Sequence, residues 1–431
     1  MSEKIGIDVI VIGGGAAGMM ACLTAAAAGA RTLLLEKNEK TGKKIYITGK
    51  GRCNVTNTAE GEEFFRQIPR NAKFLYSALS EFGRDELLAI LSENGTETKV
   101  ERGGRVFPVS DRASDVTRAL TRALSRAGAG IRLNTPVLSV CPENGGFSVR
   151  LNHGETLHAA ACVVATGGIS YPSTGSTGDG YRFAGETSHE IVPPRGALVP
   201  LTTDAAWPAL LQGLSLRNVR LIARQGKRVL YDGLGEMLFT HFGYSGPLIL
   251  ECSSHMPDDL RDAALYLDLK PGLDEKQVDA RLVREIAEAK NRQLSSLLRT
   301  MLPLRFAPVF AELCGLDPHM PAAFLDREGR RRLASAFKAL PLPLRGYRPV
   351  EEAIVTRGGV SVKDVAPNTM MSRRCPGLFF AGEVLDVDAH TGGFNLQIAF
   401  STGALAGRCA AGYAARHAKE QKVHEQDEVR F

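Results

Sequence analysis

The sequence predicts an α/β fold built around a Rossmann-like dinucleotide-binding unit, and three observations near its start predict it. A short apolar run at residues 7–12 leads directly into the glycine-rich segment 13–18. An alanine-rich stretch, residues 19–28, has the composition of a helix. A second apolar run, residues 31–35, ends on Glu36. Strand, glycine turn, helix, strand and acidic residue in this order are typical of the βαβ unit that binds dinucleotides.

Each residue of this fingerprint has a physical role. Gly13 permits the tight turn out of the strand, Gly15 lets the backbone approach a pyrophosphate, and Gly18 lets the helix pack close to the strand. The N-terminus of the helix presents unpaired N–H groups and a partial positive charge to the phosphates. Glu36, eighteen residues after Gly18, can accept hydrogen bonds from ribose hydroxyls. Both strands, the helix and the acidic residue occur at the expected positions, which favours a nucleotide site over a glycine-rich turn that binds nothing.

Length and composition describe an ordinary globular protein with a mild positive charge. The chain has 431 residues, of which 44% are hydrophobic and 23% charged, enough for two or three domains. The net charge of +6 suits an anionic ligand but does not by itself argue for nucleic acid. The eight cysteines show neither a C-x-x-C motif nor metal-ligand spacing, so we expect no metal site and no disulfide framework. Without a signal sequence or a long apolar run, we expect a reduced, soluble, cytoplasmic protein with no membrane partner.

Changes in composition along the chain suggest three parts. We expect a nucleotide-binding domain from residues 1–192 and 361–431, because glycine-rich segments of the same kind occur near both ends of the chain. From Pro193 the chain reads as short strands, which predicts a β-rich inserted domain at residues 193–272 and 341–360. Residues 273–340 have helical periodicity and few β-branched residues, which predicts a helical insert.

Three features favour FAD over NAD as the nucleotide. The fingerprint lies in the first eighteen residues, and no second G-x-G-x-x-G follows a strand. A buried strand ends in Thr166-Gly167, and another, residues 378–380, is followed by Gly382-Glu383. Both would return to the same ligand. NAD(P)H then has no domain of its own, and as a reductant it would visit the flavin only transiently.

Two polar loops are expected to cover the ligand. Residues 40–57 are rich in Gly, Lys and Asn, so their cations could meet phosphates or an anionic flavin ring. Residues 171–180 form a long loop of Gly, Ser and Thr. The competing interpretations are a solvated basic loop for the first and a plain linker for the second.

Several blocks together resemble one known family. They are residues 13–18, 48–57, 165–168, 235–247, 382–386 and 392–395, and the Gly-Arg-Cys-Asn and Phe-Thr-His…Ser-Gly-Pro segments are its specific marks. The chain is similar over nearly its whole length to a bacterial family of FAD-dependent oxidoreductases that includes 3-dehydro-bile-acid Δ4,6-reductase and aminoacetone oxidase. The resemblance implies a flavoprotein of the two-dinucleotide-binding-domain type, with an FAD domain, a β-barrel-like insert and a helical subdomain.

The resemblance also implies which residues would contact non-covalently bound FAD. The pyrophosphate would lie against Gly13, Gly15, Ala16, Ala17 and Gly18, and the ribose against Glu36. Adenine would meet the backbone near Val137. The remaining contacts implied are Lys37, Lys44, Gly51, Arg52, Cys53, Asn54, Thr166, Gly167, Gly382, Glu383, Asp386, Gly393, Asn395, Leu396, Gln397 and Ile398. Two positions depart from the family pattern: Ala389 stands where glycine is common, and Phe394 replaces a common tyrosine and removes a hydroxyl near the flavin.

The leading functional hypothesis is NAD(P)H-driven reduction of an activated C=C bond, such as that of a 3-oxo-Δ4 or Δ4,6 steroid or bile acid. Flavin carries the hydride chemistry, so the protein must supply orientation and a proton. Candidate proton donors are His241, Tyr244, Tyr171 and His390, with His241 preferred because histidine titrates near neutral pH. For each of them a structural hydrogen-bonding role is the competing interpretation.

Two alternatives stay open at this point. One is a flavin-dependent oxidase of a small amine that produces hydrogen peroxide, although the basic loop does not favour a cationic substrate. The other is a flavin-bearing nucleic-acid-associated or regulatory protein that uses the cluster Arg330-Arg331-Arg332. A solvated helix face explains that cluster better. We therefore expect a small-molecule substrate, no nucleic acid and no obligate protein partner.

Overall fold

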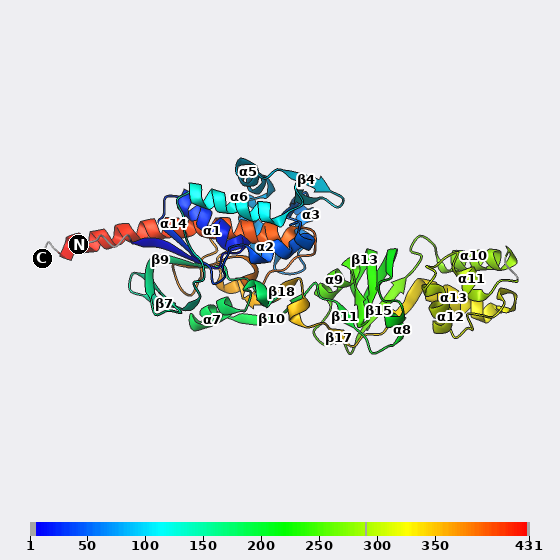
Figure 1. The fold of residues 1–431 in the computed structure, drawn as a ribbon. Coiled ribbons are helices and arrows are strands. Elements are labelled where there is room, and N and C mark those ends of the chain that lie inside the picture. The colour runs from blue at the N-terminus through cyan, green and yellow to red at the C-terminus, as the bar shows by residue number, and fades with distance from the viewer. Residues whose placement is uncertain (1–5, 289–290, 429–431) are drawn as a thin grey trace. The chain divides into compact units, whose positions relative to one another are not determined.

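The structure, a computed structural model, describes residues 6–288 and 291–428, with side chains up to Lys419. The chain divides into two compact units (Figure 1). Unit 1 combines residues up to 197 with those from 353 onward, and unit 2 contains residues 198–352. Each unit has its own hydrophobic core.

Unit 1 is built on a sheet whose central strands are parallel. The path of the sheet is β6-β2-β1-β9-β8-β7, and β19 also pairs with β9. Strands β1, β2, β6, β9 and β19 are joined by parallel pairings, whereas β7 and β8 are antiparallel. Their bounds are β1 Ile7–Ile12, β2 Thr32–Leu35, β6 Gly130–Arg132, β7 Val137–Glu143, β8 Gly146–Leu151, β9 Thr156–Val164 and β19 Leu378–Phe380. The apolar runs of β1 and β9 form this centre because helices cover both faces of a parallel sheet.

Helices from the two ends of the chain pack side by side in unit 1. Helix α1 (Ala16–Ala27) follows β1, and α14 (Phe394–Glu428) closes the fold beside it (Figure 1). Small residues allow the close approach. The other helices of the unit are α2 Lys43–Ile47, α3 Gly61–Phe65, α4 Tyr76–Glu81, α5 Arg84–Glu93, α6 Ala113–Arg126 and α7 Asp179–Glu186.

Two small sheets complete unit 1. One has three antiparallel strands in the order β3-β5-β4, with β3 at Thr56–Asn57, β4 at Thr98–Glu101 and β5 at Arg105–Pro108. The other pairs β10 (Ile191–Ala197) with β18 (Val355–Val360) in antiparallel fashion.

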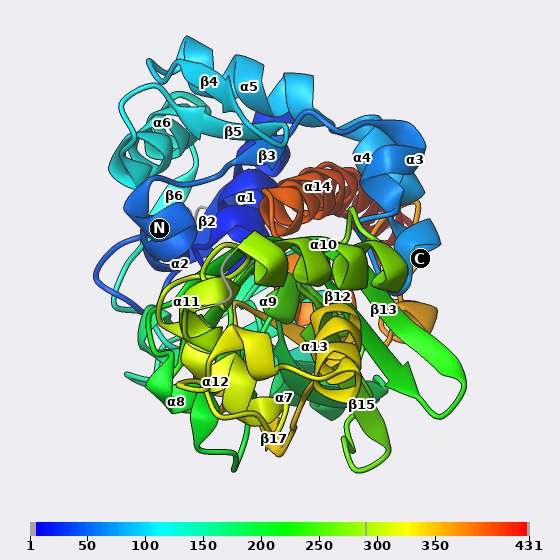
Figure 2. The same ribbon diagram turned by 90° about the vertical axis from the view of Figure 1, so that its right-hand side faces the viewer.

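Unit 2 combines a seven-stranded sheet with helices around one core. The sheet order is β16-β15-β12-β13-β14-β11-β17. Figure 2 shows α10 and α13 in front of β12, β13 and β15. The strands are β11 Leu201–Thr202, β12 Ser215–Gln225, β13 Arg228–Thr240, β14 Gly243–Ser245, β15 Ala263–Asp268, β16 Leu340–Leu342 and β17 Gly346–Tyr347. The helices are α8 Trp207–Leu210, α9 Pro247–His255, α10 Glu275–Glu288, α11 Leu294–Leu298, α12 Phe306–Leu313 and α13 Arg327–Ala339.

The structure draws several boundaries at other residues than the sequence suggests. Residues 131–140, expected as one strand, form β6 and β7 on either side of a break at residues 133–136. Two expected strands, 156–159 and 161–166, are the single strand β9. The segment 355–360, expected in the β-rich insert, lies in unit 1 because its backbone pairs with β10. The expected helical insert shares unit 2 and its core with the sheet.

Helices of the described part of the chain are too short or too polar to cross a lipid bilayer.

Candidate cofactor and active site

The carboxyl ends of the central parallel strands meet at one edge of the unit 1 sheet. Ile12, the last residue of β1, is in register with Leu35 of β2 and with Val164 of β9. Val164 is in turn in register with Phe380 of β19. The segments that follow these strands therefore begin beside one another, which is where open α/β sheets bind nucleotides. This edge receives the fingerprint glycines, Glu36, Thr166-Gly167 and Gly382-Glu383.

The three fingerprint glycines have different surroundings. A Cβ on Gly13, whose φ is +101°, would lie 2.5 Å from the carbonyl oxygen of Ala165. A Cβ on Gly18 would lie 1.8 Å from the Gly13 carbonyl oxygen, so packing excludes a side chain there. At Gly15 no atom lies within 4 Å of that position. Gly15 therefore faces open space before the N-terminus of α1, where helix N–H groups can receive a pyrophosphate.

Glu36 is held in place at the end of β2. Its side chain is buried, and Oε2 accepts the N–H of Gly14 at 2.7 Å. Oε1 accepts the backbone N–H and the side-chain amide of Asn38 at 2.8 and 2.7 Å. The N–H of Thr135 donates to the Glu36 carbonyl oxygen at 2.9 Å, which brings the start of β7, and with it Val137, to this corner. A carboxylate has about four lone-pair sites, so Glu36 keeps acceptor capacity for ribose hydroxyls.

The contacts between α1 and α14 show that the two helices run parallel with a stagger. A Cβ on Gly403 would lie 2.3 Å from the Ala17 carbonyl oxygen, and one on Gly407 would lie 2.0 Å from that of Ala21. From the first contact to the second, the contacting residue moves four positions toward the C-terminus on both helices, so the helices run parallel. Helix α14 begins nine residues before Gly403 and α1 begins one residue before Ala17. At 1.5 Å per residue the start of α14 lies about 12 Å beyond that of α1.

The turn before α14 is fixed by backbone and amide contacts. Gly392 and Gly393 have φ values of +127° and +100°, and a Cβ on Gly393 would lie 2.3 Å from the Thr56 carbonyl oxygen. The amide of Asn57 donates to the Gly392 carbonyl oxygen at 2.9 Å. We call residues 392–393 the α14 turn. Asn395 and Gln397 support it: the Asn395 amide donates to the Ala389 carbonyl oxygen at 2.7 Å, and Gln397 Oε1 accepts the Thr56 hydroxyl at 2.6 Å.

A charged network joins four segments at this edge. Lys44 Nζ lies 2.6 Å from Glu383 Oε2 and donates to the hydroxyl of Ser170 at 2.7 Å. Glu383 Oε1 also accepts the Ser170 hydroxyl at 3.0 Å and the N–H of Thr356 at 2.8 Å. The predicted residues Lys44 and Glu383 are thus brought together. Ser170 and Thr356 were missed, because partners so distant along the chain leave no spacing signal.

The other predicted cations also form internal ion pairs. Lys37 Nζ lies 2.7 Å from Asp179 Oδ2, at the end of the 171–180 loop. The guanidinium of Arg52 contacts the carboxylates of Glu101 and Asp111, which raise the pKa of Arg52. Lys37, Lys44 and Arg52 therefore hold loops together, and their charges are already balanced by carboxylates.

The segment from Gly49 to Asn54 has an unusual backbone. Gly49, Lys50, Gly51 and Cys53 have φ values of +57°, +58°, +86° and +61°, a conformation that costs energy for residues other than glycine. Burial raises the pKa of the Cys53 thiol to about 12, so it is not a thiolate nucleophile at neutral pH. Such strained segments occur mainly at functional sites.

Two predicted cofactor residues carry buried oxygens that lack a hydrogen-bond partner among the described residues. They are Asn54 Oδ1 and Thr166 Oγ1. A buried polar atom without a partner costs free energy unless a ligand satisfies it. Together with the open space at Gly15, the free capacity of Glu36 and the 12 Å stagger of the helices, these atoms fit an extended dinucleotide such as FAD.

Asp386 and the first residues of α14 are further parts of the expected cofactor site. Asp386 Oδ1 accepts the N–H of Gly358 at 3.1 Å, and Asn71 donates to its Oδ2 at 3.1 Å. Leu396 and Ile398 lie in the first turns of α14, and Ile398 is buried. Phe394 packs edge-on against Phe64, with ring centroids 5.2 Å apart.

The four candidate proton donors are divided between the units. In unit 1, the backbone N–H of His390 donates to the Gln67 carbonyl oxygen at 2.8 Å, and its ring Nδ1 lies 3.2 Å from Gln67 Oε1. Tyr171, also in unit 1, has a φ of +51°. In unit 2, His241 is exposed between β13 and β14. Tyr244 is fully buried against Phe239, and burial raises the pKa of its phenol. The catalytic role of all four residues stays a prediction. For Tyr244, the position in the core favours a packing role over proton donation.

Asp388 is a further residue of interest that sequence reasoning missed. Its side chain is fully buried, Oδ2 has no hydrogen-bond partner in the described structure, and Oδ1 lies 3.3 Å from an Arg70 nitrogen. Burial raises the pKa of this carboxyl, and the charge of Arg70 opposes the shift. No motif or spacing in the sequence marks Asp388.

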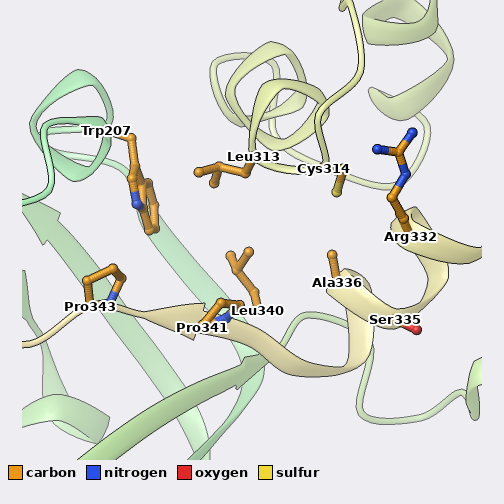
Figure 3. Close-up of a pocket in the computed structure, with 9 residues that line it drawn as sticks. All are labelled: Trp207, Leu313, Cys314, Arg332, Ser335, Ala336, Leu340, Pro341 and Pro343. Carbon is orange, nitrogen blue, oxygen red and sulfur yellow. The ribbon is translucent and has the colours of Figure 1, made fainter. Parts of the chain in front are cut away.

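Unit 2 contains a mostly apolar cavity of about 380 Å³ (Figure 3). Trp207 faces it from α8, and Leu340 faces it from the start of β16. Its other lining residues are Leu313, Cys314, Arg332, Ser335, Ala336, Pro341 and Pro343. None of the residues predicted for cofactor binding or catalysis lines it.

The arginine cluster 330–332 is largely neutralised within unit 2. Arg330 pairs with Asp279 at 2.5 Å, and Arg331 pairs with Glu328 at 2.9 Å. Arg332 lies beside Cys314 at the end of α12 (Figure 3). These contacts support the helix-face interpretation of the cluster.

Fold and site together define an FAD-dependent oxidoreductase with a Rossmann-like FAD-binding domain. Residues 7–409 match the model of the HI0933-like protein Rossmann domain, and the chain belongs to this family. A 3-dehydro-bile acid delta(4,6)-reductase of Clostridium scindens is 32% identical over 385 residues, covering 89% of this chain and 93% of that protein.

A second relative has a different name at a similar distance. A ribosomal RNA dihydrouridine synthase of Escherichia coli is 33% identical over 403 residues, covering 92% of this chain and 96% of that protein. Among solved structures, a 3-ketosteroid-Δ4-(5α)-dehydrogenase of Rhodococcus jostii aligns with 16% identity and a TM-score of 0.48, covering 95% of this chain and 97% of that one.

Proposed function

We propose that this protein is an FAD-dependent reductase of C=C bonds conjugated to a carbonyl group, with NAD(P)H as the electron source. One observation carries the proposal: two relatives at nearly equal identity have names that imply the same reaction class, reduction of a conjugated C=C bond. The two double bonds of a 3-oxo-Δ4,6 steroid and the C5=C6 bond of uracil are all conjugated to a carbonyl. Saturating one such bond requires a hydride at its carbon farther from the carbonyl and a proton at its nearer carbon.

The residues of unit 1 would bind and orient the cofactor. The N-terminus of α1 and Gly15 would receive the pyrophosphate, and Glu36 the adenosine ribose. When bound, FAD supplies the hydride from its reduced ring. The α14 turn lies at the N-terminus of a helix, whose unpaired N–H groups favour negative charge nearby. That charge preference would stabilise the anionic form of the reduced ring.

The protein must also supply the proton. A donor has to come within hydrogen-bond reach of the α-carbon of the bound substrate. His390 lies two residues before the α14 turn, and Tyr171 begins the loop after the Thr166-Gly167 segment. A double bond, one NAD(P)H and one proton would give the saturated product and NAD(P)⁺.

Anaerobic flavin spectroscopy tests the proposal. The holoprotein would be reduced with NADH or NADPH, and reoxidation of the flavin would be followed after mixing with a 3-oxo-Δ4,6 bile acid or with unmodified ribosomal RNA. We expect rapid reoxidation by one of them, with the saturated product identified by mass spectrometry. Reoxidation by neither substrate, or peroxide formation from aminoacetone in air as the only turnover, would refute the proposal and favour the amine oxidase.

A further inference from the structure

The tip of the β4–β5 hairpin carries two arginines on a glycine turn. The hairpin connects Glu101 to Arg105 through Arg102, Gly103 and Gly104. The two glycines have φ values of +79° and +69° and thereby close the turn. Arg102 and Arg105 are both exposed. Neither forms an ion pair within the part of the chain that the structure describes.

This tip lies directly beside the α14 turn. The amide of Asn57 donates to the Gly103 carbonyl oxygen at 3.1 Å and to the Gly392 carbonyl oxygen at 2.9 Å. The N–H of Thr58 also donates to the Gly104 carbonyl oxygen at 2.7 Å. One side chain therefore joins the hairpin tip to the turn proposed to face the flavin ring, and the two cannot separate without breaking these bonds.

The charges around the hairpin do not cancel. Arg52 and Lys99 are balanced by Glu101 and Asp111, two cations against two carboxylates. Arg105 lies over the ring of Phe107 with its guanidinium carbon 5.6 Å from the ring centroid, and its Nε donates to the Arg102 carbonyl oxygen.

A third cation belongs to the same surface. A Cβ on Gly49 would lie 3.2 Å from the Phe107 ring, and the next residue, Lys50, is exposed and forms no ion pair with any described residue. Arg102, Arg105 and Lys50 are therefore three exposed cations for which the described residues supply no ion pair.

We infer that Arg102 and Arg105 form an oxyanion subsite at the edge of the active site that binds an anionic group of the substrate. Guanidinium groups present forked N–H donors that match carboxylate and phosphate oxygens. The subsite is separate from the cofactor phosphates, because the N-terminus of α1 that would hold them lies about 12 Å from the start of α14. This inference rests on the proposed function, and it adds which part of the substrate the chain recognises.

The anion has two possible sources that share the same chemistry. A steroid acid offers one carboxylate at a distance from its 3-oxo-diene, and a polynucleotide offers phosphodiesters on both sides of its uracil. Both place an oxyanion some distance from the conjugated double bond, so either can reach a cationic hairpin tip while the double bond lies at the flavin.

Binding to the holoprotein tests the inference with probes from both sources. The first probe is a fluorescent ten-nucleotide oligouridylate, and the second is a 3-oxo-Δ4,6 bile acid compared with its methyl ester. The variants are Arg102→Gln and Arg105→Gln, alone and combined, with Arg105→Lys to restore the charge. Arg126→Gln is the matched control. Arg126 is also exposed on unit 1, at the C-terminal end of α6, where its guanidinium donates to the Glu93 carbonyl oxygen at 3.0 Å.

We expect each glutamine substitution to weaken binding of one anionic probe about tenfold, with partial recovery in Arg105→Lys, which restores the charge but not the forked donors, and no change in Arg126→Gln. Loss confined to the oligouridylate, with a shallower salt dependence, identifies phosphodiesters. Loss confined to the free acid, with the ester unaffected, identifies the carboxylate. For a probe that is also reduced, KM should rise while kcat holds.

Three results would overturn the inference. They are binding of neither probe by the unsubstituted holoprotein, equal binding by the double variant, and an equal loss in Arg126→Gln. Melting temperatures of all variants distinguish loss of a contact from loss of the fold. A probe that binds through Arg102 and Arg105 but is never reduced would refute the proposed reaction while leaving the subsite intact.

Discussion

The packing of α14 on α1 provides a sharp test of how the cofactor site is assembled. A Cβ placed on Gly407 would lie 2.0 Å from the Ala21 carbonyl oxygen and 2.4 Å from the Thr24 hydroxyl oxygen. Thr24 cannot move aside freely, because it donates to the Ala404 carbonyl oxygen at 3.0 Å. Replacing Gly407 with alanine must therefore push the two helices apart.

The free-energy change has two opposing parts. Alanine in a helix interior is favoured over glycine by about 1 kcal/mol. Overpacking a tight contact costs about 1–3 kcal/mol. Gly412 supplies the matched control, because it lies in the same helix and its nearest atom is a side-chain nitrogen of Arg416 at 3.7 Å. Gly412→Ala should gain the propensity term alone, so the two variants should differ by about 1–3 kcal/mol.

Thermal unfolding of the apoprotein and of the FAD-loaded protein would measure this difference. At about 2 °C per kcal/mol for a unit of this size, Gly407→Ala should melt about 2–6 °C below Gly412→Ala. FAD should also dissociate more readily from Gly407→Ala, because the separation between the two helices that would hold it increases. Equal melting temperatures for the two variants would show that the close approach of α1 and α14 is not tight.

Three further predictions concern the site. Gly15→Ala should leave the melting temperature of the apoprotein unchanged, because its Cβ enters only the open space before α1. The same Cβ should raise the FAD dissociation constant, measured by flavin fluorescence, about tenfold. A lower apoprotein melting temperature would contradict this. A double-mutant cycle of Lys44→Met and Glu383→Gln should give a coupling free energy of about 1–3 kcal/mol in urea unfolding, since both side chains are largely buried; additive effects would argue against the network. Burial raises the pKa of Asp388 above its ordinary 3.8, so the folded state holds this proton more tightly than the unfolded state and stability falls as pH rises through that range. The stability of Asp388→Asn relative to the unsubstituted protein should accordingly increase from pH 4 upward, and a pH-independent difference would refute the assignment.

The sequence predicted those parts of the fold that follow from local chemistry. The βαβ unit from Ile7 to Glu36 was predicted correctly because each step depends on neighbouring residues: an apolar strand, glycines with open or positive-φ surroundings, and an acidic end. The return of the chain at Thr166 and Gly382 was also readable, since both follow apolar strands. Register then brings these segments together at the edge of the sheet.

What the sequence did not predict depends on contacts between distant residues. The strand expected at 131–140 breaks because its first half pairs with β2 and its second half pairs with β8. The sequence pattern of this run does not predict that the pairing partner changes. The cations of the 40–57 loop looked available to phosphates, yet the carboxylates that neutralise Lys44 and Arg52 lie at Glu383, Glu101 and Asp111. Unpaired charge, as on Arg102, becomes visible only once such pairs are known.

The pairing of β10 with β18 has a consequence for how such proteins diversify. Ala197 and Val355 are direct partners on these antiparallel strands, so their Cα atoms lie about 5 Å apart. The chain thus leaves unit 1 for unit 2 and comes back at adjacent points. A loop as short as that of a β-hairpin could replace all of unit 2 without stretching β10 or β18. Neighbouring exit and entry points are what domain insertion requires. Unit 2 can therefore be replaced by another domain during evolution, while the residues from Gly13 to Glu36 and from Gly382 to Ile398 are retained.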